Sequence, residues 1–235
     1  MRGSPGKPSD VENEVRAPSL SPKVVAKKAP QQSANPLWRL FAGRSLSWAH
    51  AALVRFSSLT ASFEISREQF ESVFELGSGA SADATLQSAF VRLDTQRKGY
   101  ADAFECFVCV CLFACSEPDY RLRFLYGLFD LHGTNWLTAK ELQMAVKCCY
   151  VCLAKMGAVL PARAFEDGVH RKIVRNGIRV LRGSAGHSHA PASEDKVNGM
   201  TSDEFVSWVL GKLHGRTVSF WKGVQNLQLR MLGAQ

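Results

Sequence analysis

Apolar residues recur along the chain at spacings of three and four, which is the pattern of helices that bury one face. The pattern occupies 49–56, 86–93 and 122–129 before three short polar stretches, and 70–74, 104–111, 142–149 and 205–209 after four such stretches. The sequence therefore predicts an all-α fold made of four helix-loop-helix units.

Helix-start signals lie at the boundaries set by this pattern. Ser66 stands three residues before Gln69, which is the spacing of a capping box, in which each side chain accepts a hydrogen bond from the other residue's backbone amide. Thr138 precedes Glu141 by the same distance. Both signals predict helices that begin inside the last part of a polar stretch.

The polar stretches resemble one another in length and in order of residues. We refer to them as the first loop (58–69), the second loop (94–105), the third loop (130–141) and the fourth loop (193–204). The first three start at even intervals, and the fourth is delayed by a Gly-, Ser- and His-rich insertion. A repeated period of this kind indicates one structural unit used several times.

With these repeats, the chain from about Trp48 to Leu213 is similar to EF-hand proteins of the recoverin and calcineurin-B-like branch. The resemblance rests on the four repeats, the degenerate first loop and the longer linker before the fourth loop. It implies that the repeats pair two by two through short strands at the eighth loop residue, and these residues are Ile65, Ala101, Leu137 and Met200.

The resemblance also sets the expected domain boundaries. We expect a basic disordered or extended arm at 1–35, an N-terminal EF-hand pair at 36–116, a C-terminal pair at 117–215 with a linker insertion at 183–192, and a C-terminal amphipathic helix at 216–235. The arm is rich in proline and in basic residues and has little aromatic content, so it cannot form a packed core alone.

Calcium in an EF-hand loop is bound by oxygen atoms from loop positions one, three, five, seven, nine and twelve. In the third loop these positions hold Asp130, His132, Thr134, Trp136, Thr138 and Glu141. In the second loop the retained candidates are Asp94, Gln96, Asp102 and Glu105. The second and third loops are therefore the candidate metal sites.

Neither loop has the composition of a strong calcium site. His132 offers nitrogen where a hard cation prefers oxygen, and Lys98 stands at the fifth position of the second loop, where its charge opposes a dication. The first loop has no acid at its ligand positions, and the fourth keeps only Asp195 and Glu204. We therefore expect calcium binding to be weak or lost, and we expect no other cofactor.

Two pairs of cysteines have the CxxC spacing, Cys106 with Cys109 and Cys149 with Cys152. Such pairs bind zinc in other proteins, but these lie inside amphipathic helices, where buried small apolar residues are the alternative interpretation. The odd total of seven cysteines favours a reducing compartment. Because no apolar run is long enough to cross a bilayer, we expect no transmembrane segment and a cytoplasmic location.

The formal net charge of +8 favours partners with acidic surfaces. On a helix predicted at about 162–182, four arginines share one face: Arg171, Arg175, Arg179 and Arg182. These arginines form either a solvated face or a docking stripe for an acidic surface.

Two apolar segments are candidates for helix docking. The C-terminal helix carries an apolar stripe formed by Phe220, Trp221, Val224, Leu227 and Met231. A second segment begins with a helix-start signal at Asn35. In families of this kind an amphipathic helix enters a hydrophobic groove, and that helix comes either from a partner or from the same chain.

No arrangement of catalytic residues is found in the sequence, so we do not expect an enzyme. The leading hypothesis is a structural or adaptor subunit of a larger assembly, with a slight preference for a cytoskeletal or axonemal one. The alternative is a calcium-responsive regulatory subunit that binds an amphipathic helix of a kinase, phosphatase or channel. Nucleic acid is not expected as the main ligand, because no aromatic stacking platform is visible.

Overall fold

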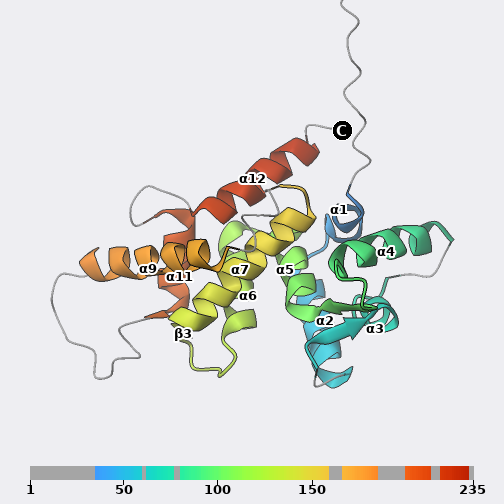
Figure 1. Ribbon diagram of the computed structural model, residues 1–235, viewed down its shortest axis with the longest axis horizontal. Helices are drawn as coiled ribbons and strands as arrows, with labels where there is room; N and C mark the ends of the chain where they lie inside the picture. The colour runs from blue at the N-terminus through green and yellow to red at the C-terminus, as the bar shows by residue number, and fades with distance from the viewer. Residues whose placement is uncertain are drawn as a thin grey trace, which may run out of the picture. The chain divides into compact units, whose positions relative to one another are not determined.

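The computed structural model describes residues 35–59, 62–76, 80–158, 166–184, 199–212 and 218–232 (Figure 1). Within these ranges the protein is mostly helical, which confirms the predicted all-α class. The predicted arm at 1–35 lies outside the described residues except for Asn35, and the insertion at 183–192 lies outside them except for its first two residues.

The helices are α1 (Pro36–Phe41), α2 (Leu46–Leu59), α3 (Arg67–Val73), α4 (Ala80–Leu93), α5 (Ala103–Phe113), α6 (Pro118–Phe129), α7 (Ala139–Lys155), α9 (Asp167–Ser184), α11 (Ser202–Leu210) and α12 (Ser219–Leu232). The strands are β1 (Glu64–Ser66), β2 (Tyr100–Asp102), β3 (Leu137–Thr138) and β4 (Gly199–Met200). In the part of the chain that the structure describes, no helix combines the length and the apolar character needed to cross a lipid bilayer.

The strands form two separate antiparallel pairs. In the pair of β1 and β2, Ile65 lies opposite Ala101, and in the pair of β3 and β4, Leu137 lies opposite Met200. These are the four residues for which the resemblance to EF-hand repeats implies pairing. A two-stranded ribbon is only marginally stable in water. The fully buried side chains of Ile65, Leu137 and Met200 therefore anchor the two ribbons in the helical core.

Side-chain caps determine where the helices after the loops begin. At the start of α3, the Ser66 hydroxyl accepts a hydrogen bond from the Gln69 amide, and the Gln69 side chain accepts one from the Ser66 amide. Thr138 and Glu141 form the same reciprocal box at the start of α7. Both capping boxes are predicted by the sequence, and α11 begins with a third.

Helix α5 lies at the centre of the packed core. It is apolar on every side, and every residue from 106 to 113 is buried, as expected for a helix without a polar face. It packs against α1, α2, α6, α7 and α12. The core is therefore continuous across the predicted boundary between 36–116 and 117–215.

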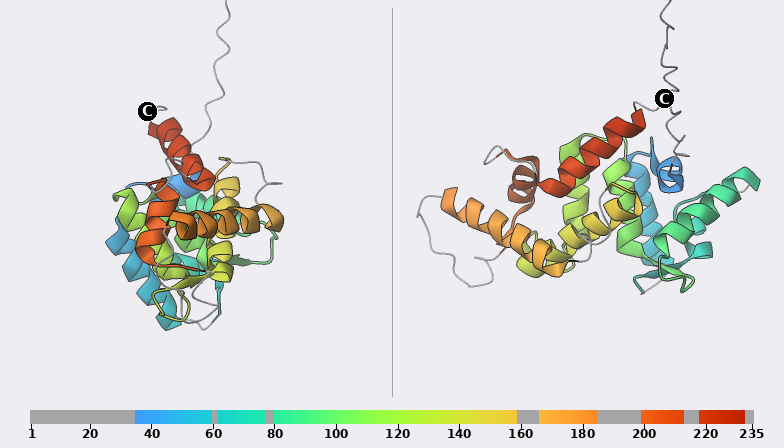
Figure 2. Two further views of the ribbon diagram at one scale, coloured as in Figure 1. Left: turned by 90° about the vertical axis from the view of Figure 1, so that its left-hand side faces the viewer. Right: turned by 45° about the horizontal axis from the view of Figure 1, so that its top comes forward.

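Two further helices cover this core. Helix α1 packs against α4 and α5, and its side chains Leu37 and Phe41 are both fully buried. Helix α12 packs against α7 and α5, and Figure 2 shows it lying along α7. The indole ring of Trp221 on α12 is fully buried, with the Arg121 guanidinium 4.9 Å from the ring centre. Both apolar segments that the sequence singles out are thus bound within the chain.

Candidate ion-binding site

The second and third loops are closed by hydrogen bonds from their own backbone. The Asp94 carboxylate accepts hydrogen bonds from the amides of the fifth and sixth residues of the second loop, at 2.9 and 2.7 Å. The Asp130 carboxylate accepts the equivalent bonds in the third loop, at 2.9 and 2.8 Å. The sixth residue has a positive φ in both loops, +81° at Gly99 and +54° at Asn135, a conformation that Gly and Asn adopt more readily than other residues. The amides of each loop thus hold the carboxylate at its first position.

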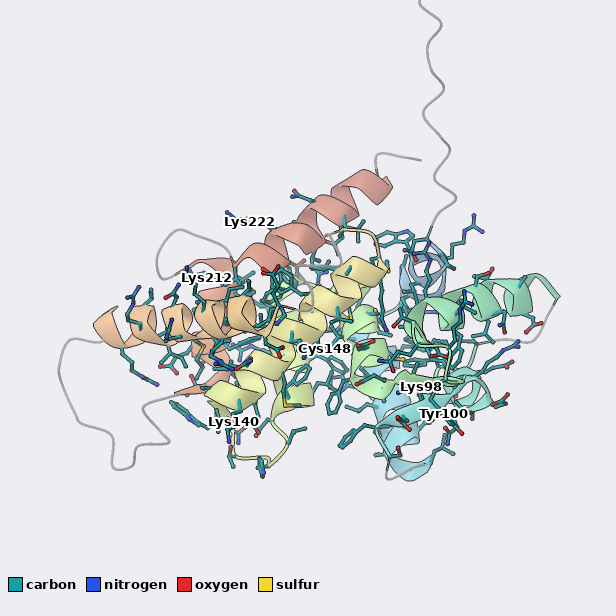
Figure 3. All side chains as sticks on the ribbon, viewed as in Figure 1. Lys98, Tyr100, Lys140, Cys148, Lys212 and Lys222 are labelled. Carbon is teal, nitrogen blue, oxygen red and sulfur yellow. The ribbon has the colours of Figure 1, made fainter. Side chains whose placement is uncertain are left out.

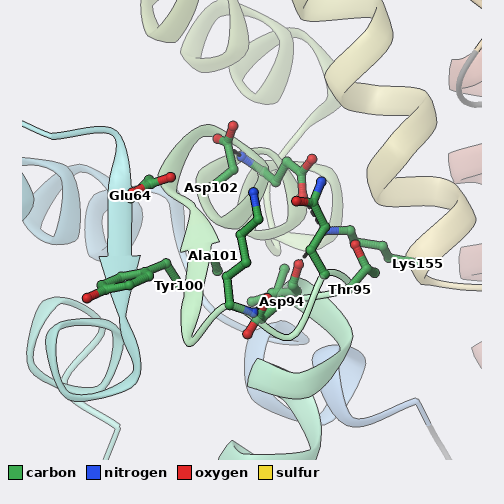
Figure 4. Close-up of a pocket in the computed structure, with 11 residues that line it drawn as sticks. Glu64, Asp94, Thr95, Tyr100, Ala101, Asp102 and Lys155 are labelled. Carbon is green, nitrogen blue, oxygen red and sulfur yellow. Dashed lines mark hydrogen bonds and ion pairs between the residues drawn. The ribbon is translucent and has the colours of Figure 1, made fainter.

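A lysine from a helix distant in sequence lines the cavity of the second loop. The cavity has a volume of about 240 Å³, and its lining includes Asp94 and Asp102. Lys155, the last residue of α7, donates hydrogen bonds from its ammonium group to the Glu105 carboxylate and to the Leu93 carbonyl oxygen (Figure 4). Its side chain is only 7% exposed. A positive charge of the protein itself therefore occupies the neighbourhood of Glu105.

Burial and charge act in opposite directions on this pair. Burial raises the pKa of the Glu105 carboxyl, and the charge of Lys155 offsets only part of that rise. Burial lowers the pKa of the Lys155 ammonium, but the charge and hydrogen bond of Glu105 outweigh it and raise the pKa above its ordinary value. The ammonium is therefore charged at neutral pH. Removing either partner would leave an uncompensated charge in a mostly buried place.

In the third loop, Glu141 has a histidine beside it. One carboxylate oxygen lies 3.1 Å from Nδ1 of His132, and the other accepts hydrogen bonds from the amide and hydroxyl of Thr138, both at 2.8 Å. Burial raises the pKa of Glu141, but the hydrogen bonds from Thr138 and His132 outweigh it, so the net pKa is lowered. The Glu141 side chain is 7% exposed, whereas the His132 ring is 76% exposed.

In the fourth loop, Glu204 is contacted by an arginine. Arg182, near the end of α9, donates to the Glu204 carboxylate at 3.3 Å and to the Gly199 carbonyl oxygen at 3.0 Å. Its guanidinium also lies 5.4 Å from the centre of the Trp136 ring, which belongs to the third loop. Arg182 thus joins α9 to β4, to α11 and to the neighbouring loop.

Each of the three glutamates at the twelfth position of a loop therefore has a basic side chain of the same chain beside it. In the second and fourth loops the basic residue comes from outside the loop, and in the third it is the loop's own histidine. The first loop has Gln69 at this position, and that side chain is used in the cap of α3. We call the two charged side chains among these basic residues, Lys155 and Arg182, the resident cations.

The remaining predicted ligands are engaged within their loops or exposed. Asp102 accepts a hydrogen bond from the Glu105 amide at 3.2 Å, and it caps α5. The Thr134 hydroxyl donates to the Trp136 carbonyl oxygen at 3.0 Å. Gln96 is exposed and lines the cavity of the second loop. Within the described residues, no group of three or more His, Cys, Asp or Glu side chains is arranged to hold a metal ion.

Gly199 stands at the seventh position of the fourth loop, one residue after the usual bend. The close packing of Trp136 explains why this position is a glycine. A Cβ atom at Gly199 would overlap the indole ring of Trp136 and the carbonyl oxygen of Leu137. Only a glycine lets the ring lie against this strand. The fourth loop therefore keeps its glycine for packing between the two loops.

The structure divides the predicted arginine stripe. Arg171, Arg175 and Arg179 are exposed on α9, and they form no ion pair with any residue that the structure describes. Arg182 is half-buried and is bound to Glu204 and Gly199. Its prediction as a member of a free docking stripe is therefore corrected, because its guanidinium is already used inside the protein.

The apolar stripe of the C-terminal helix faces the protein's own core. The buried members are Phe220, Trp221, Val224 and Leu227, and the side chain of Met231 lies outside the described residues. These four side chains pack within this chain, so their prediction as partner-binding residues is corrected in favour of the self-docked alternative. The physical reason is that α7 and α5 present an apolar surface that α12 covers.

The CxxC cysteines are buried in the core between α5 and α7. Burial raises the pKa of the Cys106, Cys149 and Cys152 thiols well above the usual value, and it raises the pKa of Cys111 to about 12. Thiolate is the form that binds metals and reacts. At neutral pH these thiols are therefore protonated and pack as small apolar side chains.

No model of a known protein family matches this chain, and a comparison with curated proteins gives no match. The function is therefore inferred from the residues and their geometry. Sequence reasoning missed Lys155, which carries no local signal because its partner Glu105 lies 50 residues earlier. It also placed His132 among the ligands, where the structure places it as the partner of Glu141.

Proposed function

We propose that this protein is a non-catalytic, EF-hand-like structural or adaptor subunit of a larger assembly, in which resident cations replace calcium. The observation that carries the proposal is that each twelfth-position glutamate has a basic side chain beside it. In a functional EF-hand this glutamate is the bidentate ligand of the ion. Here its carboxylate is already engaged by the protein.

Electrostatics favours the resident cation over calcium in the second loop. Two unit charges about 4 Å apart interact by roughly 4 kcal/mol at an effective dielectric constant of about 20. A dication next to Lys155 would therefore meet a repulsion on the order of 8 kcal/mol unless the lysine moved away. Such a movement would also break the hydrogen bond that the Leu93 carbonyl oxygen accepts from the Lys155 ammonium. Lys98 lines the same cavity and adds to the repulsion.

The resident cations also connect the loops to the rest of the fold. Lys155 belongs to α7 and Arg182 to α9, so each contact joins a loop to a helix outside it. A calcium sensor changes the position of its helices when the ion binds. A covalently attached cation cannot dissociate, and we therefore infer a permanently closed frame. The burial of α12 against α7 and α5 supports the same inference, because an apolar surface suited to a partner helix is already covered.

A calcium-responsive regulatory subunit is the second candidate, and one observation in the third loop favours it. The basic side chain there is a histidine whose ring is 76% exposed. An exposed ring can turn away into solvent without loss of packing, which Lys155 cannot do. If any loop still binds calcium, the third loop is the one in which the ion meets least opposition. In that case the protein would present an altered surface to an amphipathic helix of a kinase, phosphatase or channel.

Calorimetric titration of the full chain with Ca²⁺ tests the proposal. We expect no binding event in the micromolar range. A micromolar event that disappears in Glu141→Gln would instead establish the third loop as a calcium site and support the regulatory candidate. An event that persists in Glu141→Gln but disappears in Glu105→Gln would assign the ion to the second loop and overturn the proposed role of Lys155.

A further inference from the structure

An apolar groove runs between α7 and α9. Its volume is about 610 Å³, and its floor includes Val174 and Ile178, which are 3% and 9% exposed. Ala139 at the start of α7 adds a third apolar side chain. Figure 2 shows α9 crossing α7 on the side of the fold away from α4. The groove is separate from the surface that α12 covers, because none of its lining residues belongs to α12.

The rim of this groove is basic. It is formed by Lys140, Arg171, Arg175, Arg179 and Arg182. Figure 3 shows Lys140 in the first turn of α7. Arg182 is bound to Glu204, but the other four form no ion pair with the described residues, and no acidic side chain among those residues lines the groove. Four positive charges therefore surround an apolar floor, and Asp167, which interacts with Arg171 but is paired with Lys147, lies outside the groove lining.

The spacing of the arginines matches a second helix. Arg171, Arg175 and Arg179 follow one another every four residues, so they lie about 6 Å apart along α9. A helix that lies along α9 repeats its own side chains at the same distance. Acidic residues at every fourth position would meet the arginines, and apolar residues three positions after an acid would point into the groove.

We propose that this groove binds an amphipathic helix of a partner protein that carries acidic residues along one edge and apolar residues along its face. This inference rests on the proposed role as an interaction module and names its partner by chemistry. Charge complementarity with the rim provides attraction and orientation, and burial of apolar side chains on Val174 and Ile178 provides affinity. An anionic membrane fits less well, since a membrane surface engages protruding apolar residues and these two lie at the bottom of a concavity.

Fluorescence anisotropy with the full chain tests the proposal. The probe is a labelled synthetic helical peptide with Glu at positions i, i+4 and i+8 and Leu at i+3 and i+7. The comparison peptide has Gln in place of each Glu. We expect the Glu peptide to bind at least about tenfold more tightly than the Gln peptide, with affinity falling as salt is added.

Charge reversal in the groove provides the second arm of the test. We expect Arg175→Glu with Arg179→Glu to weaken binding of the Glu peptide by about tenfold or more. The matched control is Arg39→Glu with Lys222→Glu, which changes the net charge equally on α1 and α12; Figure 3 shows Lys222 on α12, away from Lys140. Circular dichroism on thermal unfolding checks that all variants are folded.

Three results would overturn the proposal. The first is equal binding of the Glu and Gln peptides, and the second is equal loss of binding in the groove and control variants. The third is binding to vesicles of phosphatidylserine and phosphatidylcholine, lost in the groove variant, without binding of the peptide, which would assign the rim to a membrane. None of these results changes the calcium titration, so failure of the groove and failure of the proposed function are distinguishable.

Discussion

Lys155 and Glu105 form an ion pair between the last residue of α7 and the first turn of α5, although 50 residues separate them in the sequence. The ammonium also binds the Leu93 carbonyl oxygen at the end of α4. One side chain thus joins three helices around the second loop. The loop is closed by the protein's own charge, so its shape does not depend on an added ion.

Replacement of Lys155 by Met tests this contact. Met keeps the length of the side chain and removes the charge, which leaves the mostly buried Glu105 carboxylate without its partner. Because the pair is partly accessible to solvent, we expect a loss of about 2–3 kcal/mol in the free energy of unfolding, below the range for fully buried pairs. Urea denaturation followed by circular dichroism measures this loss.

The double variant Lys155→Met with Glu105→Gln is the matched control for that change. It removes both charges, so we expect it to be more stable than Lys155→Met alone by at least about 1 kcal/mol. If the two variants were equally unstable, Lys155 would act through packing, and the ion pair would not be the source of the stability.

The pH dependence of stability depends on Glu141. Its pKa is lowered in the folded state below the ordinary value of a glutamate, so the folded state favours the deprotonated form. Its contribution to stability is present above that value and is lost as the pH falls through the folded pKa. We expect the free energy of unfolding to decrease less between about pH 6 and pH 3 in Glu141→Gln than in the wild type. Gln at this position can keep the helix cap, as Gln69 does in α3, and an unchanged pH profile would contradict this account of Glu141.

His170 adds a second acid-sensitive position. Its side chain is fully buried, neither ring nitrogen has a hydrogen-bond partner among the described residues, and its ring lies 5.3 Å from that of Tyr150. Burial lowers its pKa below 6.5, although the charge of Asp167 acts in the opposite direction. As the pH is lowered, the histidine of the unfolded chain therefore binds its proton at a higher pH than that of the folded protein. The free energy of unfolding decreases as the pH drops below about 6.5. We expect His170→Leu to lose less stability than the wild type between about pH 7 and pH 5, measured by thermal unfolding.

Gly177 on α9 is required by close packing against Trp208 of α11. A Cβ atom at Gly177 would overlap the indole ring of Trp208. We expect Gly177→Ala to destabilise the protein by about 1–3 kcal/mol, as overpacking does. Gly127→Ala on α6 is the control, because a Cβ atom there meets no neighbour within 4 Å, and we expect it to stabilise by about 0.5–1 kcal/mol. Equal effects of the two substitutions on the free energy of unfolding would refute the packing argument.

Local patterns in the sequence predict the helices and two capping boxes, because each depends on residues close together in the chain. The pairing of Ile65 with Ala101 is instead what the resemblance to EF-hand repeats implies. The contacts of Lys155 with Glu105 and of Trp136 with Gly199 could not be predicted in this way. They depend on how separate helix-loop-helix units pack, and a lysine at the end of a helix is ordinarily read as a favourable charge for that helix end.

The burial of α12 marks a different limit of sequence reasoning. An apolar helix face predicts that something will cover it, but the periodicity of Phe220 and Val224 does not distinguish a partner from the chain's own core. The same limit applies to α9, where Arg179 and Arg182 look equivalent in the sequence. Only the position of Glu204 separates the bound arginine from the exposed one.

Thermal unfolding of the full chain in about 1 mM Ca²⁺ and in excess chelator tests the central claim most directly, because a ligand that binds only the folded state raises Tm. If resident cations replace calcium, the two Tm values will agree within about 1 °C. A loop with a Kd near 10 μM would instead add about 2.7 kcal/mol and raise Tm by roughly 5–10 °C. A rise of that size, abolished by Glu141→Gln or Glu105→Gln, would contradict the account.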